Sequence, residues 1–289
     1  EVIHEDGGIK IIIAYLDGMV NKTILNQDII QPLVDNKDRI MNSLSQGKGE
    51  AIKEIKYNIL FDCEIEDTKD FRGALGDILS GDSILFIDGE GVAIKLCTKG
   101  WEQRGIEKPE TEAVVRGPRE GFTESLRTNT SMLRRKIKNA QLKFEQMKMG
   151  TESHTDICIC YIQGLANEEI LKDLRRRLEQ IRMDIILESA YIEEFIQDNP
   201  YSIFPTVGRS ERPDVIAAKL LEGRIAILCD GTPFVLTVPH LFIETLQSNE
   251  DYYTGPFFAS MVRLIRVFAL IITTIVPAFY VALLSFHLG

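Results

Sequence analysis

The stretch IIIAYLDGMVNKTIL, residues 11–25, aligns without gaps onto ICICYIQGLANEEIL, residues 157–171. Seven of the 15 aligned positions are identical, all at an offset of 146 residues, which is hard to attribute to chance. Each copy has a β-branched run, a glycine and then an asparagine, whose side chain can accept hydrogen bonds from the free amides of a helix start. The pattern therefore predicts a strand, a turn and a helix in each copy.

A second pair of segments recurs later in each half. LSGDSILFIDGEGVAIKL (79–96) aligns onto LEGRIAILCDGTPFVLTV (221–238) at an offset of 142 residues. Each copy indicates the end of a helix, a glycine stop, a strand, an Asp-Gly turn and a return strand. Because the same elements recur in the same order, we predict an α/β fold with two related lobes. This internal duplication should have mixed sheets flanked by helices.

The repeats also predict the domain boundaries. Residues 1–118 should form the first α/β lobe and residues 119–250 the second. Residues 251–289 should form an interfacial segment and a first transmembrane helix. Two lobes leave a cleft between them, and clefts are common ligand sites. The alternative is that the second lobe only adds a packing surface.

The connection between the lobes, residues 99–122, is rich in glycine, proline and charge, as is typical of a crossover segment. It leads into residues 122–147, whose apolar side chains recur at helical spacing, so we predict an amphipathic helix there. The other side of this helix is basic, through Arg127, Arg134, Arg135, Lys138 and Lys143. These residues form either a solvated face or a surface for acidic neighbours in this chain or in a partner subunit.

Residues 267–286 form a stretch of 20 residues without a charged side chain. A helix of that length spans roughly 30 Å, the thickness of the hydrocarbon core of a bilayer. Arg263 and Arg266 precede it and mark the predicted membrane boundary; such basic residues stay on the cytoplasmic side, so we expect the large soluble part there. Pro277 removes a backbone donor in the middle of the span and is a candidate transmembrane kink. The alternative is a buried core helix.

The composition argues against several classes of protein. There are 43 acidic and 33 basic residues, and the resulting net charge of −10 argues against a nucleic-acid binder. The 5 cysteines are an odd number without metal-ligand spacing, so we expect a reducing compartment and no disulfide framework. The chain has neither an initiator methionine nor a signal-peptide pattern, and we expect it to be a piece of a longer protein.

The sequence contains no recognisable catalytic motif, and we predict no catalytic residues, no metal site and no cofactor. The glycines of residues 87–92 lie in a predicted hairpin, without the helix and the Gly-Lys-Ser/Thr sequence that a phosphate loop needs. No histidine accompanies a candidate serine or cysteine nucleophile. Cys158 and Cys160 alternate along a predicted strand and should be buried core thiols.

Two polar clusters are candidates for ligand or interface sites. The first comprises Arg116, Arg119 and Glu120, where two guanidinium groups accompany a restricted backbone. The second comprises Glu211, Arg212 and Asp214, with opposite charges around a predicted helix start. Since arginine pairs with carboxylates through two parallel hydrogen bonds, the clusters predict ion-pair latches or anion recognition. Helix capping with local salt bridges is the alternative interpretation.

Several motifs in fixed order resemble the A subunits of GerA-family spore germinant receptors. They are RGPREGFTESLRTN (116–129), GTESHTDICICYIQGLAN (150–167), FPTVGRSERPDVIAAKLLEGRIAILCDGTPFVLTVP (204–239), NEDYY (249–253) and the arginine-flanked entry into the span. The resemblance extends over residues 1–289 and is dense from residue 116 onward.

The resemblance implies a location in the spore inner membrane, with the N-terminal domain on the cytoplasmic, spore-core side. It implies as partners the B and C subunits of the receptor, other A subunits in a homo-oligomer and the lipid bilayer, with a small-molecule germinant as a candidate ligand. It also implies that A subunits form a cation channel that opens on sensing. This chain would be the N-terminal domain and first span, and should not conduct by itself.

The leading hypothesis is a non-enzymatic module that assembles with neighbouring A subunits and couples nutrient sensing to ion release through the membrane part. One alternative places the nutrient in the interlobe cleft, as in bilobed solute-binding proteins, although a cytosolic cleft is poorly placed for a nutrient from outside. Another is a SpoVAF-type paralogue that shares these motifs and contributes to ion release in germination. An enzyme is the least favoured class.

Overall fold

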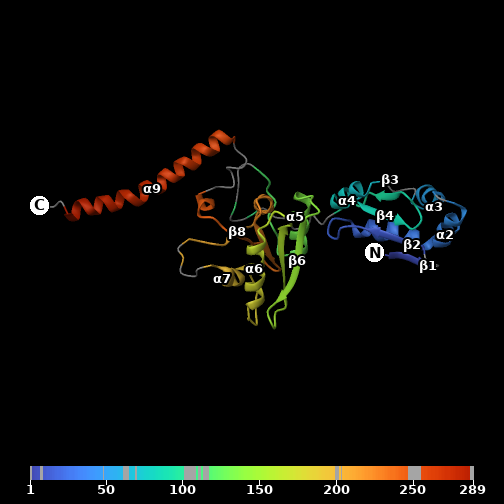
Figure 1. Ribbon diagram of the computed structural model, residues 1–289, viewed down its shortest axis with the longest axis horizontal. Coiled ribbons are helices and arrows are strands. Elements are labelled where there is room, and N and C mark those ends of the chain that lie inside the picture. Colours follow the sequence, from blue (N-terminus) through green and yellow to red (C-terminus); the bar gives the residue numbers. More distant parts are fainter. Residues whose placement is uncertain are drawn as a thin grey trace.

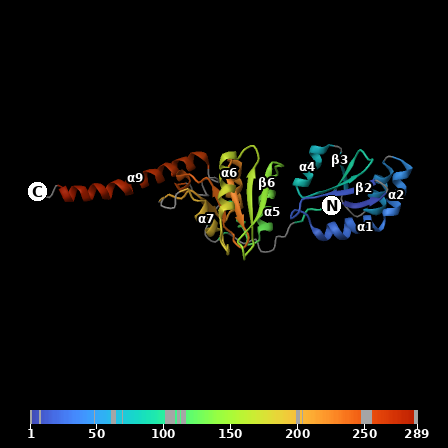
Figure 2. The same ribbon diagram turned by 60° about the horizontal axis from the view of Figure 1, so that its bottom comes forward.

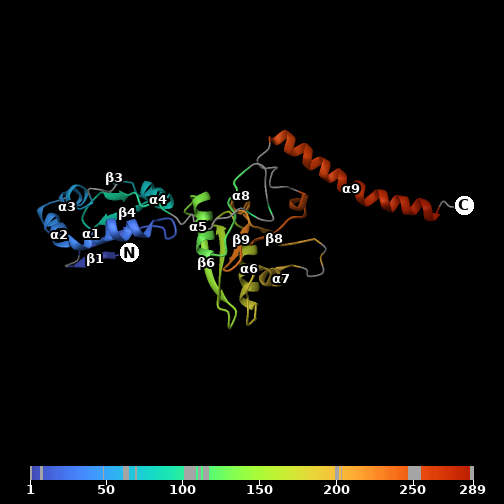
Figure 3. The same cartoon turned by 180° about the vertical axis from the view of Figure 1, so that it is seen from behind.

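The computed structural model describes residues 2–6, 9–47, 49–60, 65–68, 70–100, 109, 112, 117–198, 202, 204–246 and 255–286. Two lobes follow one another, and a long C-terminal helix extends from the second lobe (Figure 1). The other views show the same arrangement, with the first lobe and the end of the helix at opposite ends of the molecule (Figures 2 and 3).

The first lobe contains a five-stranded antiparallel sheet in the order β1-β2-β4-β5-β3. Its strands are β1 (Val2–Asp6), β2 (Ile9–Ala14), β3 (Ile65–Thr68), β4 (Ser83–Ile87) and β5 (Ala93–Leu96). An extended helical layer packs on one face and the single helix α4 (Phe71–Leu79) on the other. The layer comprises η1 (Ile24–Ile30), α1 (Gln31–Asp35), α2 (Lys37–Gln46), α3 (Glu50–Glu54) and η2 (Ile55–Ile59).

The second lobe repeats the sheet in the order β6-β7-β9-β10-β8. Its strands are β6 (Leu142–Met149), β7 (Thr155–Ile162), β8 (Gly208–Ser210), β9 (Ile225–Cys229) and β10 (Val235–Val238). Helices α6 (Glu168–Gln180) and α7 (Ser189–Ile196) cover one face, and α5 (Leu126–Lys136) and α8 (Pro213–Leu221) cover the other. The short helix η3 (Phe242–Leu246) and α9 (Pro256–Phe286) follow the sheet.

The two lobes are related, as the sequence repeats predict. In the first sheet Ile11 pairs with Ile87, and their repeat counterparts Ile157 and Cys229 pair in the second. The asparagine of each copy opens a helix: the Asn21 side chain accepts from the amides of Thr23 and Ile24, and the Asn167 side chain from the two equivalent amides. The α/β duplication is therefore confirmed at the level of topology, register and capping.

In each lobe, a glycine just before the central strand allows two segments of backbone to approach closely. Gly81 has φ +96° and Gly223 has φ +87°, a region that favours glycine. A Cβ atom would lie 3.0 Å from the carbonyl oxygen of Met19 in the first case and 2.8 Å from that of Leu165 in the second. Gly81 therefore lets the start of β4 pass directly beside the turn after β2, and Gly223 lets the start of β9 pass directly beside the turn after β7.

The prediction of mixed sheets was wrong, because the pairings of both sheets are antiparallel. A strand-turn-helix unit yields a parallel neighbour only when the next strand pairs beside the first. Here the next strand along the chain, β3 or β8, lies at the far edge of its sheet. The chain then returns to the centre through α4 or α8, and β4 or β9 enters antiparallel.

The predicted helix over residues 122–147 was too long. Helix α5 ends at Lys136, and β6 begins at Leu142. Asn139 interrupts the helix, because its side chain accepts from the amide of Gln141 at 2.9 Å and its carbonyl from that of Leu142 at 3.1 Å. All eight residues of β6 then pair with β7. Strand pairing here outweighs a local pattern that also fits helical spacing.

The cysteines of β7 are core thiols, as predicted from their alternation. Cys158 and Cys160 are fully buried under α5 and α8, and burial raises the pKa of Cys158 to about 12. Ile12, the counterpart of Cys158 in the first repeat, remains 37% exposed. The difference follows from helix coverage, since two helices cover this face of the second sheet and one covers that of the first.

We expect Gly223→Ala to lower the free energy of unfolding by about 2 kcal/mol or more, because the new Cβ combines left-handed backbone with a contact to a carbonyl oxygen. Gly76→Ala is the matched control: Gly76 lies inside α4 with nothing within 4 Å of its Cβ position. It should stabilise by up to about 1 kcal/mol. Urea unfolding in detergent, followed by circular dichroism, measures both. Equal effects would show that the close approach is unimportant.

Candidate functional site between the lobes

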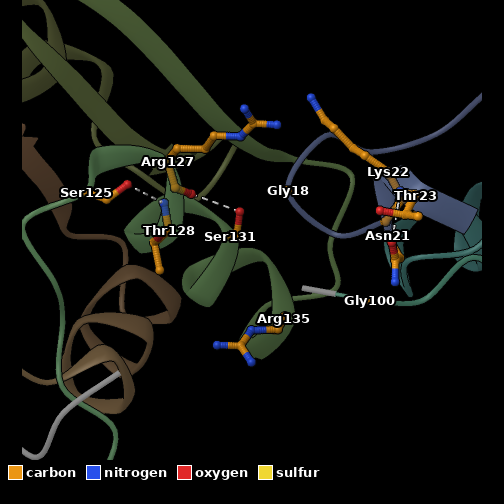
Figure 4. A pocket seen from close by; sticks show the side chains of 11 residues that line it. Gly18, Asn21, Lys22, Thr23, Gly100, Ser125, Arg127, Thr128, Ser131 and Arg135 are labelled. Atoms are coloured by element: carbon orange, nitrogen blue, oxygen red, sulfur yellow. Dashed lines mark hydrogen bonds between the residues drawn. The ribbon is translucent and has the colours of Figure 1, made fainter. Parts of the chain in front are cut away.

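A pocket of about 450 Å³ lies between the two lobes. One wall is the turn after β2 with the start of the following helix, and the other is α5 (Figure 4). The lining residues are Gly18, Val20, Asn21, Lys22, Thr23 and Gly100 on one side, and Ser125, Arg127, Thr128, Ser131 and Arg135 on the other.

Backbone hydrogen bonds hold the wall of the first lobe. The amide of Asn21 donates to the carbonyl of Thr98 at 2.8 Å, and the amide of Gly100 donates to the carbonyl of Met19 at 3.3 Å. The turn is therefore fixed to the segment that leaves β5. Since Gly81 packs against the same Met19 carbonyl, the repeat that defines the lobe also positions this side of the pocket.

The opposite wall is positioned by the Asp-Gly turn of the second repeat. The carboxylate of Asp230 accepts from the amide of Leu126 at 2.9 Å, and the amide of Gly231 donates to the carbonyl of Glu124 at 2.8 Å. Ser125 is the N-cap of α5 and accepts from the amide of Thr128 at 3.4 Å. The hairpin between β9 and β10 thus determines where α5 begins.

The lobes approach most tightly at Gly18 and Ser131. A Cβ atom on Gly18 would lie 2.1 Å from Ser131 Oγ, so the Ser131 hydroxyl would have to rotate away if another residue stood at position 18. Arg127 also pairs with Asp17, whose carboxylate is 3.3 Å from Lys22 Nζ. These three side chains are each 56% exposed, and exposed ion pairs contribute at most about 1 kcal/mol. These exposed ion pairs therefore contribute little to the interface between the lobes.

The pocket is suited to an anionic or polar group. Lys22, Arg127 and Arg135 supply positive charge, and hydroxyl groups of α5 supply further hydrogen-bonding atoms. The N-terminal turn of α5 adds partial positive charge from its amides. Arg135 also lines a second cavity, of about 300 Å³, which contains Lys136 and Lys138. A carboxylate is one chemical group that these side chains could bind.

The first predicted cluster is only partly described. Arg116 lies outside the described residues. Arg119 is exposed, and Glu120 lines the second cavity, where its carboxylate is 3.2 Å from Lys136 Nζ. The basic side of α5 therefore meets an acidic neighbour within the chain at this point and at Asp17.

The second predicted cluster is inside the second lobe, away from the pocket lining. Arg212 is fully buried and binds both carboxylate oxygens of Asp214, at 2.6 and 3.2 Å. Its Nη1 donates to the carbonyl of Glu112, and Nη2, which also binds Asp214, donates to the carbonyl of Pro118, each at 3.3 Å. The carbonyl of Glu211 accepts from the amide of Phe122 at 2.8 Å. These bonds latch the crossover segment onto the start of α8.

The sequence analysis did not single out Gly18 or Lys22 as site residues. Gly18 is part of the repeat, but Gly164, its counterpart, has the same φ of +82° and nothing within 4 Å of its Cβ position. The repeat therefore shows where a turn forms and carries no information on which copy faces α5.

Helix α9 contains a candidate membrane span, Phe257–Phe286, by length and composition. None of its most apolar window is buried within the structure. The helix runs through Pro277 and includes Arg263 and Arg266 before the charge-free part. The alternative of a buried core helix does not fit this helix, because the side chains of α9 beyond Val267 are exposed and the helix extends away from the second lobe (Figure 1).

The family model described as Bacillus/Clostridium GerA spore germination protein matches residues 2–289. The chain belongs to the GerA family. It is 42% identical over 285 residues to spore germination protein KA of Bacillus subtilis, covering 99% of this chain and 51% of that protein. The chain is also 32% identical over 227 residues to stage V sporulation protein AF of Bacillus subtilis, and this match covers 78% of this chain and 46% of that protein.

A GerA-family crystal structure shares this fold. It is the N-terminal domain of the A subunit of the Bacillus megaterium spore germinant receptor GerK3, with a TM-score of 0.61 and 35% identity. The match covers 81% of this chain and 84% of that one. The chain spans about half the length of the curated relatives that it matches.

We expect Arg212→Ala to lower the free energy of unfolding by about 3–5 kcal/mol, because it leaves the buried Asp214 carboxylate without its guanidinium partner. Arg212→Lys should recover only part of this loss, since an ammonium cannot bind two oxygens in parallel. The exposed Arg119→Ala is the control and should stay within about 0.5 kcal/mol of the parent. Urea unfolding measures all three. A loss for Arg212→Ala no larger than the control would contradict the latch.

Proposed function

We propose that this chain is the N-terminal module and first membrane span of a spore germinant receptor A subunit. The supporting observation is the GerA match across residues 2–289, together with the shared fold of the GerK3 A-subunit domain. In this proposal residues 1–118 and 119–250 are the two lobes, and residues 251–289 attach them to the membrane.

The proposed location is the spore inner membrane, with both lobes on the spore-core side. Arg263 and Arg266 stand directly before the charge-free residues 267–286, and basic residues at that place favour the cytoplasmic side. The proposed partners are the B and C subunits of the receptor and further A subunits. The exposed basic and acidic groups around α5 and the first lobe are candidates for contacts between copies.

The proposed role is to couple nutrient sensing to ion release, without a chemical step in this module. A receptor needs two arrangements of its parts and a ligand that prefers one of them. Shifting the equilibrium from 1:99 to 99:1 requires about 5.5 kcal/mol of differential affinity. The Gly18–Ser131 contact is a candidate for the element that differs between the states, because it joins the lobes where a Cβ atom on Gly18 would lie 2.1 Å from the Ser131 hydroxyl oxygen.

We expect Gly18→Ala, made in the full-length protein, to slow nutrient-triggered ion release from spores, because the new methyl group displaces the Ser131 hydroxyl from the contact between the lobes. Gly164→Ala is the matched control, since it has the same φ but open space around its Cβ position. Ion release is followed after nutrient addition, at equal protein levels, beside a deletion strain.

Four outcomes of this experiment bear on the function. Loss of the response to one nutrient class on deletion supports the receptor, and slower release in Gly18→Ala alone supports interlobe coupling. Equal behaviour of the two alanine variants would contradict the coupling. If deletion slows release for every nutrient alike, the chain is a paralogue of the stage V sporulation protein AF type, which its 32% identity to that protein makes the main competitor.

A second candidate function is nutrient binding in the interlobe pocket. The supporting observation is the combination of a cavity of about 450 Å³ with three cationic side chains and several hydroxyl groups. A pocket of this size falls within the range of small-molecule sites. A germinant that carries a carboxylate would match these groups.

We expect the protein in detergent to bind a carboxylate-bearing germinant such as an amino acid, and Arg135→Gln to weaken this binding at least tenfold. Isothermal titration calorimetry with amino acids, sugars and nucleosides measures the affinities. Lys148→Gln, on the exposed part of β6, is the control and should bind like the parent. An absence of heat for every compound, in protein that remains folded, would remove this function.

A further inference from the structure

The tip of the second lobe next to α9 exposes four large apolar side chains. They are Phe204, Leu241, Phe242 and Ile243, with exposed fractions of 56, 49, 45 and 51%. We call these four residues the η3 patch. Phe204 and Phe242 pack edge to face, with ring centroids 4.8 Å apart, so two separate segments form one apolar surface. Aromatic and aliphatic side chains grouped in this way mark an interaction site more often than scattered ones do.

The η3 patch is held outward by polar contacts on its inner side. The carboxylate of Glu244 lies 2.8 Å from Arg224 and 3.3 Å from Lys219, and the three side chains are at most 16% exposed. The amide of His240 donates to the carbonyl of Thr206 at 2.9 Å, which fixes the segment of Phe204 to that of Phe242. Because Glu244 binds inside the lobe, the side chains that precede it cannot turn inward without breaking these ion pairs.

The η3 patch also lies at the level where the candidate span begins. Helix η3 contacts the first turns of α9, and the guanidinium of Arg266 donates to the carbonyl of Leu246 at 3.1 Å. Ala259 is buried there, whereas the side chains of α9 beyond Val267 are exposed. Residues 267–286 carry no charge, so Arg266 marks the membrane boundary. Phe242 precedes Leu246 by four residues, which in a 3₁₀-helix is about 8 Å.

We propose that the η3 patch inserts into the interfacial layer of the bilayer that α9 crosses, so that the second lobe rests on the lipid surface. This inference depends on the proposed membrane attachment through α9. Lipid is favoured as the occupant because η3 contacts α9 and its last residue, Leu246, accepts a hydrogen bond from Arg266, directly before the charge-free residues. The start of α9 exposes further apolar side chains, those of Phe257, Phe258 and Met261. Aromatic side chains prefer the headgroup region, and interfacial elements bury their apolar face about 5–10 Å into it.

This placement gives the second lobe two points of attachment. Helix α9 provides the first, and the η3 patch provides the second, on a different part of the chain. The lobe is then prevented from rotating freely about the axis of the span. The contact between η3 and α9 brings these two points of attachment together on one part of the second lobe, as this arrangement requires.

Single-tryptophan variants test the insertion. Replacing the only tryptophan, Trp101, by Phe gives a background without indole emission. Phe242→Trp and Phe204→Trp then report on the patch from two independent segments. Phe279→Trp reports on the span, and Phe71→Trp, on α4 of the first lobe and 75% exposed, is the aqueous control. Each variant of the full 289-residue chain is reconstituted into phosphatidylcholine/phosphatidylglycerol vesicles, with and without phospholipid brominated near the top of the acyl chain.

The proposal expects brominated lipid to quench the emission of the Phe242→Trp and Phe204→Trp variants at least twofold, with maxima shifted to shorter wavelength, and to leave the Phe71→Trp emission unchanged. If only Phe279→Trp is affected, α9 spans the bilayer and the η3 patch does not insert, which overturns this inference alone. If Phe279→Trp is not quenched either, the membrane attachment itself fails. If the patch emission shifts to shorter wavelength without quenching, another protein segment covers the patch and the lipid assignment is wrong.

Discussion

The arrangement of this molecule depends on one repeated constraint, the passage of a glycine beside the carbonyl oxygen of a turn. Gly81 and Gly223 adopt positive φ and bring the start of a central strand against the turn after β2 or β7. Without that approach the central strand of each sheet, β4 or β9, could not begin beside the turn that opens the following helix. In the first lobe the same turn forms a wall of the interlobe pocket. The position of the glycine in the sheet therefore also determines the position of this wall.

The second lobe connects the first lobe to α9. Asp230 and Gly231 position α5, α5 contacts the turn of the first lobe at Ser131, and Arg212 latches the crossover segment onto α8. On its other side the same lobe carries η3 and α9. A change in the angle between the lobes would therefore reach α9, the candidate span, through one sheet and its helices. This continuity is the physical basis for proposing a coupling role within a GerA-family receptor.

Exposed ion pairs contribute less to this architecture than the net charge of −10 suggests. The exposed pair of Arg127 and Asp17 contributes little by itself, because water screens it. Buried ion pairs matter more: Arg212 with Asp214, and Glu244 with Arg224, each fix the position of a segment that has no regular secondary structure or only a short turn. The first pair holds the link between the lobes, and the second presents the η3 patch.

The sequence by itself determined the duplication, the two hairpins, the core position of Cys158 and Cys160 and the candidate span, because each depends on local spacing and side-chain type. It left β6 inside a predicted helix, since the apolar spacing of residues 142–147 also fits a helix and only pairing with β7 decides between the two. Tertiary structure alone decided the antiparallel sheets, which depend on where β3 and β8 lie, and the interlobe pocket. Gly18 and Gly164 occupy equivalent positions of the repeat and have the same φ, and only the neighbour of each, α5 or open space, makes one of them part of a site.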